Sequence, residues 1–183
     1  MGYGTDNTII ENNISDGVVT GESNVGQIAG IIANKFPNGL SDDNRIIDFV
    51  NDSTYPWKHD VSVKGKVAFY PTNQGIGDST SSFTCKVLSK GILAYDYKVS
   101  AENNWDYLKI YIDDVLTKEY KTLTDWTSDY IILSNDTQIV KFEYKKDSGG
   151  DSNDDKVWIA NIELCPEEVP LTLTVDGNEY GSI

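Results

Sequence analysis

The stretch that decides the fold is YDYKVSAENNWDYLKIYID, residues 95–113. Apolar residues occupy every second position in both of its halves, first from Tyr95 to Val99 and again from Leu108 to Ile112. Successive side chains of a β-strand point to opposite faces, so this alternation is typical of strands with one buried face. The stretch therefore predicts strands that place Tyr95, Tyr97, Leu108 and Ile110 in a core.

The same period of two continues on both sides of this stretch. It occurs at 61–69, 81–88 and 140–145, and near the end Trp158, Ala160, Ile162 and Leu164 share one parity. Polar turn clusters at 73–78 and 134–136 separate these runs. Evenly spaced short strands with polar turns predict an all-β fold, a two-sheet antiparallel β-sandwich over residues 45–165, with Phe142 and Trp158 also buried.

Two segments of different character flank the predicted sandwich. Residues 1–44 include a Gly- and Asn-rich β-like stretch at 9–36. Residues 166–183 begin with a Pro-bounded acidic linker, and then 171–180 alternate again. Proline cannot join a strand ladder, so this tail is expected to be a linker followed by the first strand of a further domain, extended from Pro170 with few contacts to the sandwich.

Composition excludes several classes of partner. The 183 residues hold 15 Lys and Arg against 29 Asp and Glu, a net charge of −14, with 39% hydrophobic and 11% aromatic residues. Such a chain can fill a core, but its charge repels nucleic acid and anionic membranes. A cation or a neutral, hydroxyl-rich ligand stays compatible. No apolar run reaches the ~20 residues that cross a bilayer, and no signal peptide is expected.

Catalytic motifs are missing from the sequence. The single His59 has no nucleophile elbow, zinc-binding helix or phosphate loop to accompany it, and we expect it in a solvated loop. Cys85 shares the inward parity of its strand and Cys165 does not share that of its own, which argues against a disulfide between them. Acid pairs such as Asp113-Asp114 point apart, unlike those of glycoside hydrolases. The chain is expected not to be an enzyme, with a hydrolase as a weak alternative.

The deciding stretch is followed by further motifs in a characteristic order: Trp126, then Tyr144–Ser148, then Asp155–Ile162. Together they resemble the MAM-like jelly-roll module of bacterial cell-surface proteins, a concanavalin A-like β-sandwich. The resemblance covers about 45–165 and implies a secreted, extracellular module. It departs at Ala160, where that family has an acidic residue. Residues 14–30 resemble a single degenerate GLUG-type adhesin repeat, although a Gly-rich hairpin packed on the sandwich explains them equally well.

An acidic segment offers ligands to a metal ion. Residues 147–155 contain Asp147, Asp151, Asp154 and Asp155, with no basic residue among them. Close negative charges repel each other unless they are solvated or bridged, and Ca²⁺ prefers oxygen ligands. The spacing does not fit an EF-hand, because Lys156 and Ile162 stand where Gly and Glu are required. The alternatives are a Ca²⁺ site completed by Asp78 or Glu102 and a solvated acidic hairpin.

Three aromatic residues offer a surface for a ligand. Trp105, Tyr107 and Tyr111 lie on the parity opposite Leu108 and Ile110. If those aliphatic residues face the core, the aromatic row faces outward and suits stacking against sugar rings. The alternative is that both faces of the strand are covered, either by packing or by a flanking segment such as 9–36.

These observations favour a non-catalytic module of a secreted bacterial surface protein that binds glycan or protein ligands, with calcium as a cofactor. Neighbouring domains of the same polypeptide are further expected partners. The alternative is a purely structural spacer in an adhesin stalk.

Overall fold

The computed structural model describes residues 39–60, 62–63, 65–149, 151–167, 172–175 and 178–182. These residues form strands and connecting segments without a helix, so this part of the chain has no helix that could cross a membrane. The strands are β1 (Ile46–Asn51), β2 (Lys58–Asp60), β3 (Ala68–Tyr70), β4 (Thr80–Val87), β5 (Gly91–Ser100), β6 (Tyr107–Ile112), β7 (Val115–Tyr120), β8 (Thr124–Leu133), β9 (Gln138–Lys145), β10 (Lys156–Pro166), β11 (Thr172–Val175) and β12 (Asn178–Ser182).

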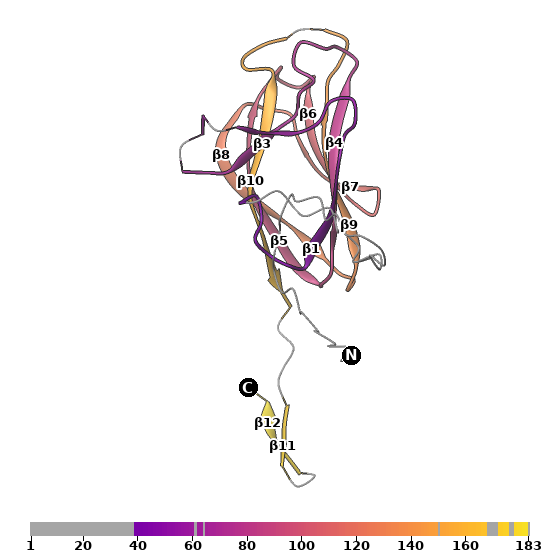
Figure 1. Ribbon diagram of the computed structural model, residues 1–183, viewed down its shortest axis with the longest axis vertical. Coiled ribbons are helices and arrows are strands. Elements are labelled where there is room, and N and C mark those ends of the chain that lie inside the picture. Colours follow the sequence, from indigo (N-terminus) through magenta and orange to yellow (C-terminus); the bar gives the residue numbers. More distant parts are fainter. Residues whose placement is uncertain are drawn as a thin grey trace, which may run out of the picture. The chain divides into compact units, whose positions relative to one another are not determined.

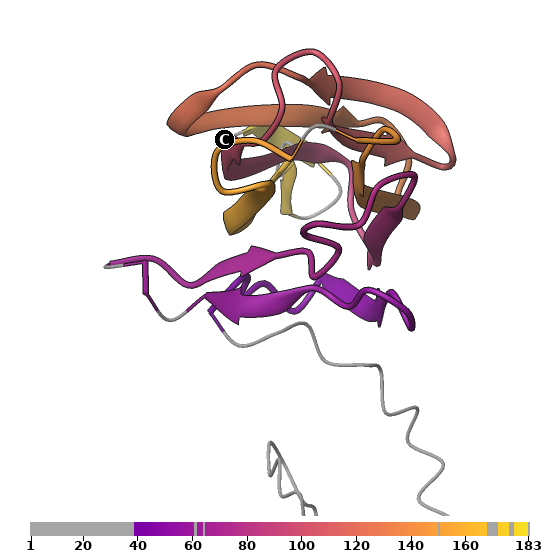
Figure 2. The same cartoon turned by 90° about the horizontal axis from the view of Figure 1, so that it is seen from above.

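Ten of these strands build two five-stranded sheets that pack face to face. The β4 sheet has the order β1-β4-β9-β6-β7, and the β10 sheet has the order β2-β3-β10-β5-β8. All of their strand pairs are antiparallel. Figure 1 shows β10 and β5 in one layer and β4 and β9 in the other. Seen from above, the β2–β3 pair and the β7–β8 segment lie at opposite edges (Figure 2). The predicted two-sheet antiparallel sandwich is confirmed.

The core lies between the two sheets and is rich in aromatic rings. The six residues that alternation placed in the interior are all buried: Tyr95, Tyr97, Leu108, Ile110, Phe142 and Trp158. Phe142 stacks on Phe83 with ring centroids 4.8 Å apart, and Tyr95 meets Phe142 edge to face at 5.6 Å. Each large apolar side chain removed from water contributes about 1.5–3 kcal/mol, so this row of rings joins the two sheets strongly.

In strand β10, the prediction that residues of one parity share one face is wrong. Val157 and Ile159 belong to the core between the sheets, whereas Trp158 and Ala160 are buried on the outer face of the β10 sheet. The pairing with β5 skips a residue between Ala160 and Glu163, and Asn161 there has a φ of 49°. This β-bulge reverses the side-chain alternation, so that Ile162 and Leu164 return to the core. Trp158 therefore shares sequence parity, but not a face, with Ile162.

The sandwich begins earlier than residue 45. Leu40 is fully buried in the core, and its carbonyl accepts a hydrogen bond of 2.8 Å from the Ile162 amide. Most of the predicted 1–44 segment, including the GLUG-like stretch, lies outside the described residues. In the tail, β11 pairs with β12, so two strands are present where the alternation predicted one. Asp176-Gly177, a strong hairpin signal, lies between them in the sequence.

Candidate functional site

The outer face of the β10 sheet carries an aromatic cluster that sequence parity concealed. Trp158 of β10 forms a buried cluster there with Ala68 and Ala160, and Tyr70 of β3 and Trp126 of β8 pack against this cluster. Trp158 is only 6% exposed, whereas Tyr70 and Trp126 are partly exposed. Trp158 is thus the covered centre of the cluster, and the other two rings form its accessible flanks.

Three lysines surround these rings. The Nζ of Lys66 lies 5.3 Å from the Trp126 ring centroid, and that of Lys98 lies 5.4 Å from the Trp158 centroid. The Nζ of Lys156 lies 4.9 Å from the Tyr70 centroid and 5.3 Å from the Trp158 centroid. Cation–π attraction holds ammonium groups over such rings, while the lysine stems cover apolar surface. We call these three aromatic residues and three lysines the Trp158 patch.

Hydrogen-bonding groups border the patch on the side of Trp126. Asp96 is bonded by Lys66, by the Ser128 hydroxyl at 2.5 Å and by the Asn161 amide at 2.8 Å. Burial by itself would raise the pKa of Asp96, but these donors outweigh it and hold that pKa below its usual value. Asp96 therefore stays ionised at neutral pH and offers a fixed acceptor beside an aromatic ring. The left-handed backbone at the β10 bulge positions the Asn161 donor.

The aromatic row predicted on the other sheet does face outward. Leu108 and Ile110 are fully buried, Tyr107 and Tyr111 are partly buried on the outer face of the β4 sheet, and Trp105 in the preceding loop is 57% exposed. The alternation therefore assigned the two faces of β6 correctly. The alternative, in which the segment 9–36 covers this face, concerns residues outside the described part of the chain.

Local contacts already occupy much of this row. The Tyr111 hydroxyl donates a hydrogen bond of 3.0 Å to Glu143, and the Lys141 Nζ lies 4.2 Å from its ring centroid. Burial, with the added effect of Glu143, raises the pKa of Tyr111 to about 12. The Lys109 Nζ lies 4.9 Å from the Tyr107 centroid. Trp105 is the most exposed ring of the row.

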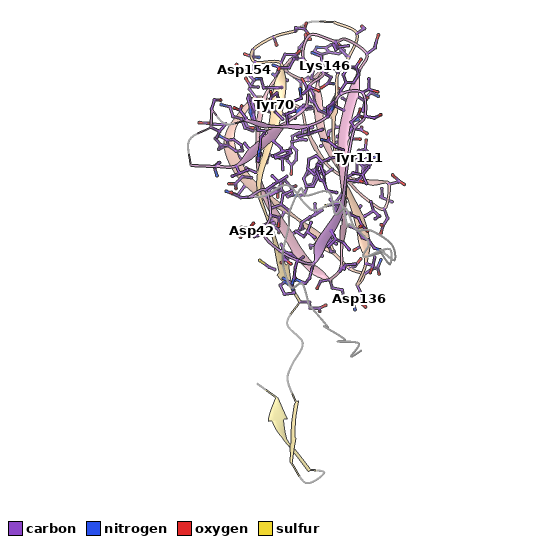
Figure 3. All side chains as sticks on the ribbon, viewed as in Figure 1. Asp42, Tyr70, Tyr111, Asp136, Lys146 and Asp154 are labelled. Atoms are coloured by element: carbon purple, nitrogen blue, oxygen red, sulfur yellow. The ribbon has the colours of Figure 1, made fainter. Side chains whose placement is uncertain are left out.

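The acidic segment 147–155 folds around a lysine that directly precedes it. The side chain of Lys146 is 2% exposed, and its ammonium group bonds Asp155 and, at 2.7 Å, Asp151. Asp155 also accepts hydrogen bonds from the Tyr144 hydroxyl at 3.1 Å and the Gly75 amide at 2.6 Å. Lys146 and Asp154 lie at the same end of the sandwich (Figure 3). An internal cation thus neutralises two of the carboxylates that the sequence assigned to calcium.

The remaining predicted metal ligands lie around the same end. The Asp78 amide donates to the Asp147 carbonyl at 2.6 Å, and a Cβ on Gly77 would lie 2.7 Å from the Ser148 carbonyl oxygen, so the loops 73–79 and 147–155 touch. Burial, followed by the nearby charges of Asp147, Asp106 and Asp151, raises the pKa of Glu102. In the part of the chain that the structure describes, no group of three His, Cys, Asp or Glu side chains is arranged to hold a metal ion. Calcium binding stays a prediction.

His59, the two cysteines and Asp113 each have surroundings that bear on the sequence predictions. His59 is exposed on β2, an edge strand rather than the expected loop, and its ring meets Phe69 at 4.5 Å. Cys85 is buried and Cys165 exposed, and both are free thiols, as parity indicated. Asp113 accepts hydrogen bonds from Gln138 and the Ile139 amide, which lower its pKa. It is therefore ionised at neutral pH and unsuited to act as a general acid.

Comparisons with known proteins describe the fold. No family model matches the chain, and no curated protein sequence matches it significantly. The secreted serine protease VesC from Vibrio cholerae is similar in structure, with 20% identity, a TM-score of 0.51, and coverage of 62% of this chain but only 24% of VesC. A point mutant of CBM29-2, a family 29 carbohydrate-binding module, has 16% identity, a TM-score of 0.40, and coverage of 71% and 84%. A further family 29 carbohydrate-binding module has 15% identity and a TM-score of 0.39. The likeness to VesC concerns the fold alone.

Proposed function

We propose that this chain is a non-catalytic glycan-binding module and that the Trp158 patch is its ligand site. One observation carries the proposal: three aromatic residues from separate strands belong to one apolar cluster on an outer sheet face, beside a hydrogen-bonded carboxylate, amide and hydroxyl. The packing of the core between the two sheets does not require aromatic residues on this outer face. Sugar rings have apolar C–H faces and polar edges, so they match aromatic rings bordered by fixed donors and acceptors.

In this proposal each group has a defined role. Tyr70 and Trp126 offer accessible ring faces, and Trp158, held by a hydrogen bond of 2.8 Å from its Nε1 to Asp60, supports them from below. At the edge of the patch, the Asp96 carboxylate accepts hydrogen bonds from sugar hydroxyls, and the Asn161 side-chain amide donates hydrogen bonds to them. The rival surface is the row Trp105, Tyr107 and Tyr111 on the opposite sheet, which the sequence singled out.

Binding to a glycan panel, followed by titration calorimetry with variants, tests the proposal. Trp126→Ala and Tyr70→Ala are expected to weaken binding about tenfold each, because each removes a stacking surface. Ile132→Ala is the matched control, since this residue is exposed on the same sheet face but outside the patch. Loss with Trp105→Ala instead of Trp126→Ala would move the site to the β4 sheet.

The surroundings of the module are a separate part of the proposal. The resemblance to MAM-like modules supports a place in a secreted, extracellular bacterial surface protein such as an adhesin. A purely structural spacer would bind no member of a broad glycan panel, whereas a hydrolase would cleave chromogenic glycosides. These two results would replace glycan binding by the spacer or by the enzyme, respectively.

A further inference from the structure

The lysines of the Trp158 patch differ in how their charges are balanced. Lys66 is paired with Asp96, which Ser128 and Asn161 also hold, so this part of the patch is neutral. Within the part of the chain that the structure describes, Lys98 has an ion-pair partner only in Asp125, at 3.8 Å, and the Asp125 side chain is 91% exposed. A solvated pair at that distance contributes little, because water screens it.

Lys156 has still less compensation. Among the described residues it makes no ion pair within 4.0 Å, and its ammonium group lies over the rings of Tyr70 and Trp158. The carboxylate of Asp60 lies close enough to feel its charge, but this group is already bonded by the Trp158 Nε1 and the Ser62 hydroxyl.

Two ammonium groups therefore share one ring. The Nζ atoms of Lys98 and Lys156 lie 5.4 Å and 5.3 Å from the same Trp158 centroid, so the two positive charges are no more than about 11 Å apart, which is about one Debye length at 0.1 M salt. A chain with a net charge of −14 has many carboxylates that could have balanced them. An anion bound beside this ring would be attracted by both ammonium groups and would gain charge-assisted hydrogen bonds from them.

We propose that Lys98 and Lys156 select glycans that carry a carboxylate, that is, hexuronate residues. This inference rests on the glycan-binding function proposed above and names its ligand class. The sugar ring stacks on Tyr70 or Trp126, and its carboxylate oxygens accept hydrogen bonds from the two ammonium groups. A neutral sugar fills the same stacking surface but leaves the two charges uncompensated.

The charge of the whole chain narrows the class further. A continuous polyanion would be repelled by the acidic surface outside the patch, since the net charge is −14. A glycan with isolated hexuronates on an otherwise neutral chain avoids this repulsion, because the sugars that lie outside the patch carry no carboxylate. Sparsely carboxylated glycans are therefore the expected ligands, ahead of polyuronates.

Matched pairs of oligosaccharides test the inference. Oligosaccharides that bear single glucuronate, galacturonate or mannuronate residues are compared with the same compounds after reduction of the carboxyl group to an alcohol, so that stacking is unchanged. At least one acidic member is expected to bind about tenfold more tightly than its reduced form, and this preference should shrink as NaCl is raised. Lys98→Met with Lys156→Met should abolish the preference, while the methionine stems still cover Trp158.

Lys90→Met is the matched control, because Lys90 is an exposed lysine outside the patch. It should keep the preference, and the melting midpoints of all variants should agree with that of the parent chain. Equal affinity for acidic and reduced members would overturn the inference and leave glycan binding intact. A preference that survives the double Lys→Met change, or is lost in Lys90→Met, would also overturn it. Binding to no sugar at all would overturn the proposed function itself.

Discussion

Lys146 is a charged residue in a place where charge is expensive. Its side chain is 2% exposed, and hydrogen bonds to Asp151 and Asp155 raise its pKa despite the opposing effect of burial. Asp155 in turn holds the Gly75 amide and the Tyr144 hydroxyl, so this one ammonium group ties the 147–155 segment to the loop 73–79 and to β9. Buried charges persist only when paired, and here the pairing organises one end of the sandwich.

Removing this charge should therefore unfold the loops or weaken the whole domain. Lys146→Met leaves Asp155 buried without its counter-ion, and the free energy of unfolding is expected to fall by about 3–5 kcal/mol. Urea unfolding measures the change. Lys145→Met, at an exposed neighbouring position, is the control and should alter stability by less than about 0.5 kcal/mol. Similar stability in both variants would show that the ion pair contributes nothing net.

The penalty of Lys146→Met should also depend on pH. Hydrogen bonding to Lys146 lowers the pKa of Asp151 from 3.8, so the contribution of this carboxylate is present above pH 3.8 and is lost as pH falls through the folded value. The pKa of Lys146 is raised from 10.5, so its contribution is lost only as pH rises beyond that. The free energies of unfolding of Lys146→Met and of the control Lys145→Met should therefore become similar in strong acid and in strong base.

At the scale of an element, the side chains of β10 do not follow one alternation from end to end. Its first part buries Trp158 outward and Ile159 inward, and after Asn161 the inward positions change parity. The bulge does more than bend the strand, because it also turns the Asn161 amide toward Asp96. One inserted residue thus contributes to both the core and the candidate ligand site.

Substitutions at Asn161 measure how strongly the bulge depends on the left-handed backbone. Asn161 has a φ of 49°, where a β-branched side chain is strained by about 1–2 kcal/mol and glycine is not. Asn161→Val should therefore lower the free energy of unfolding more than Asn161→Gly, although both lose the bond to Asp96. Glu163→Val, at an outward strand position, controls for β-branching itself. Equal effects of Val and Gly at position 161 would argue against a sterically determined bulge.

At the scale of the whole molecule, a net charge of −14 makes stability sensitive to any cation. Sodium screens repulsion in general, whereas a calcium ion bound by some of the predicted ligands would stabilise the folded state by mass action. The predicted ligands that Lys146 does not pair are Asp147, Asp154, Asp78 and Glu102. At ~100 times its dissociation constant, calcium should contribute about 2.7 kcal/mol and raise the melting midpoint by ~2–8 °C.

Thermal melting in EDTA, in CaCl₂ and in NaCl of equal ionic strength separates the two effects. A midpoint higher in CaCl₂ than in matched NaCl, and lost in Asp154→Ala, would support the calcium site. Identical midpoints in the two salts would rule it out and would leave Lys146 as the cation that holds these loops.

The sequence by itself determined the class of the fold and most of the core. Alternation needs only neighbouring residues, because the faces of a strand repeat every second position, and it correctly separated Leu108 and Ile110 from Tyr107 and Tyr111. The same reasoning assigned Cys85 to the interior and Cys165 to the surface. The acidic segment and the outward aromatic row were also visible as patterns, since both lie within short stretches of the chain.

Only the tertiary structure decided which residues meet. The bulge at Asn161 depends on the register between β10 and β5, and alternation counted along one strand cannot detect it. Tyr70, Trp126 and Trp158 are far apart in the chain and converge because sheet order places β3 and β5 beside β10, with β8 next to β5. Lys146 lies just before the acidic segment, but whether its ammonium group turns into that loop depends on packing, and packing is a property of the folded chain.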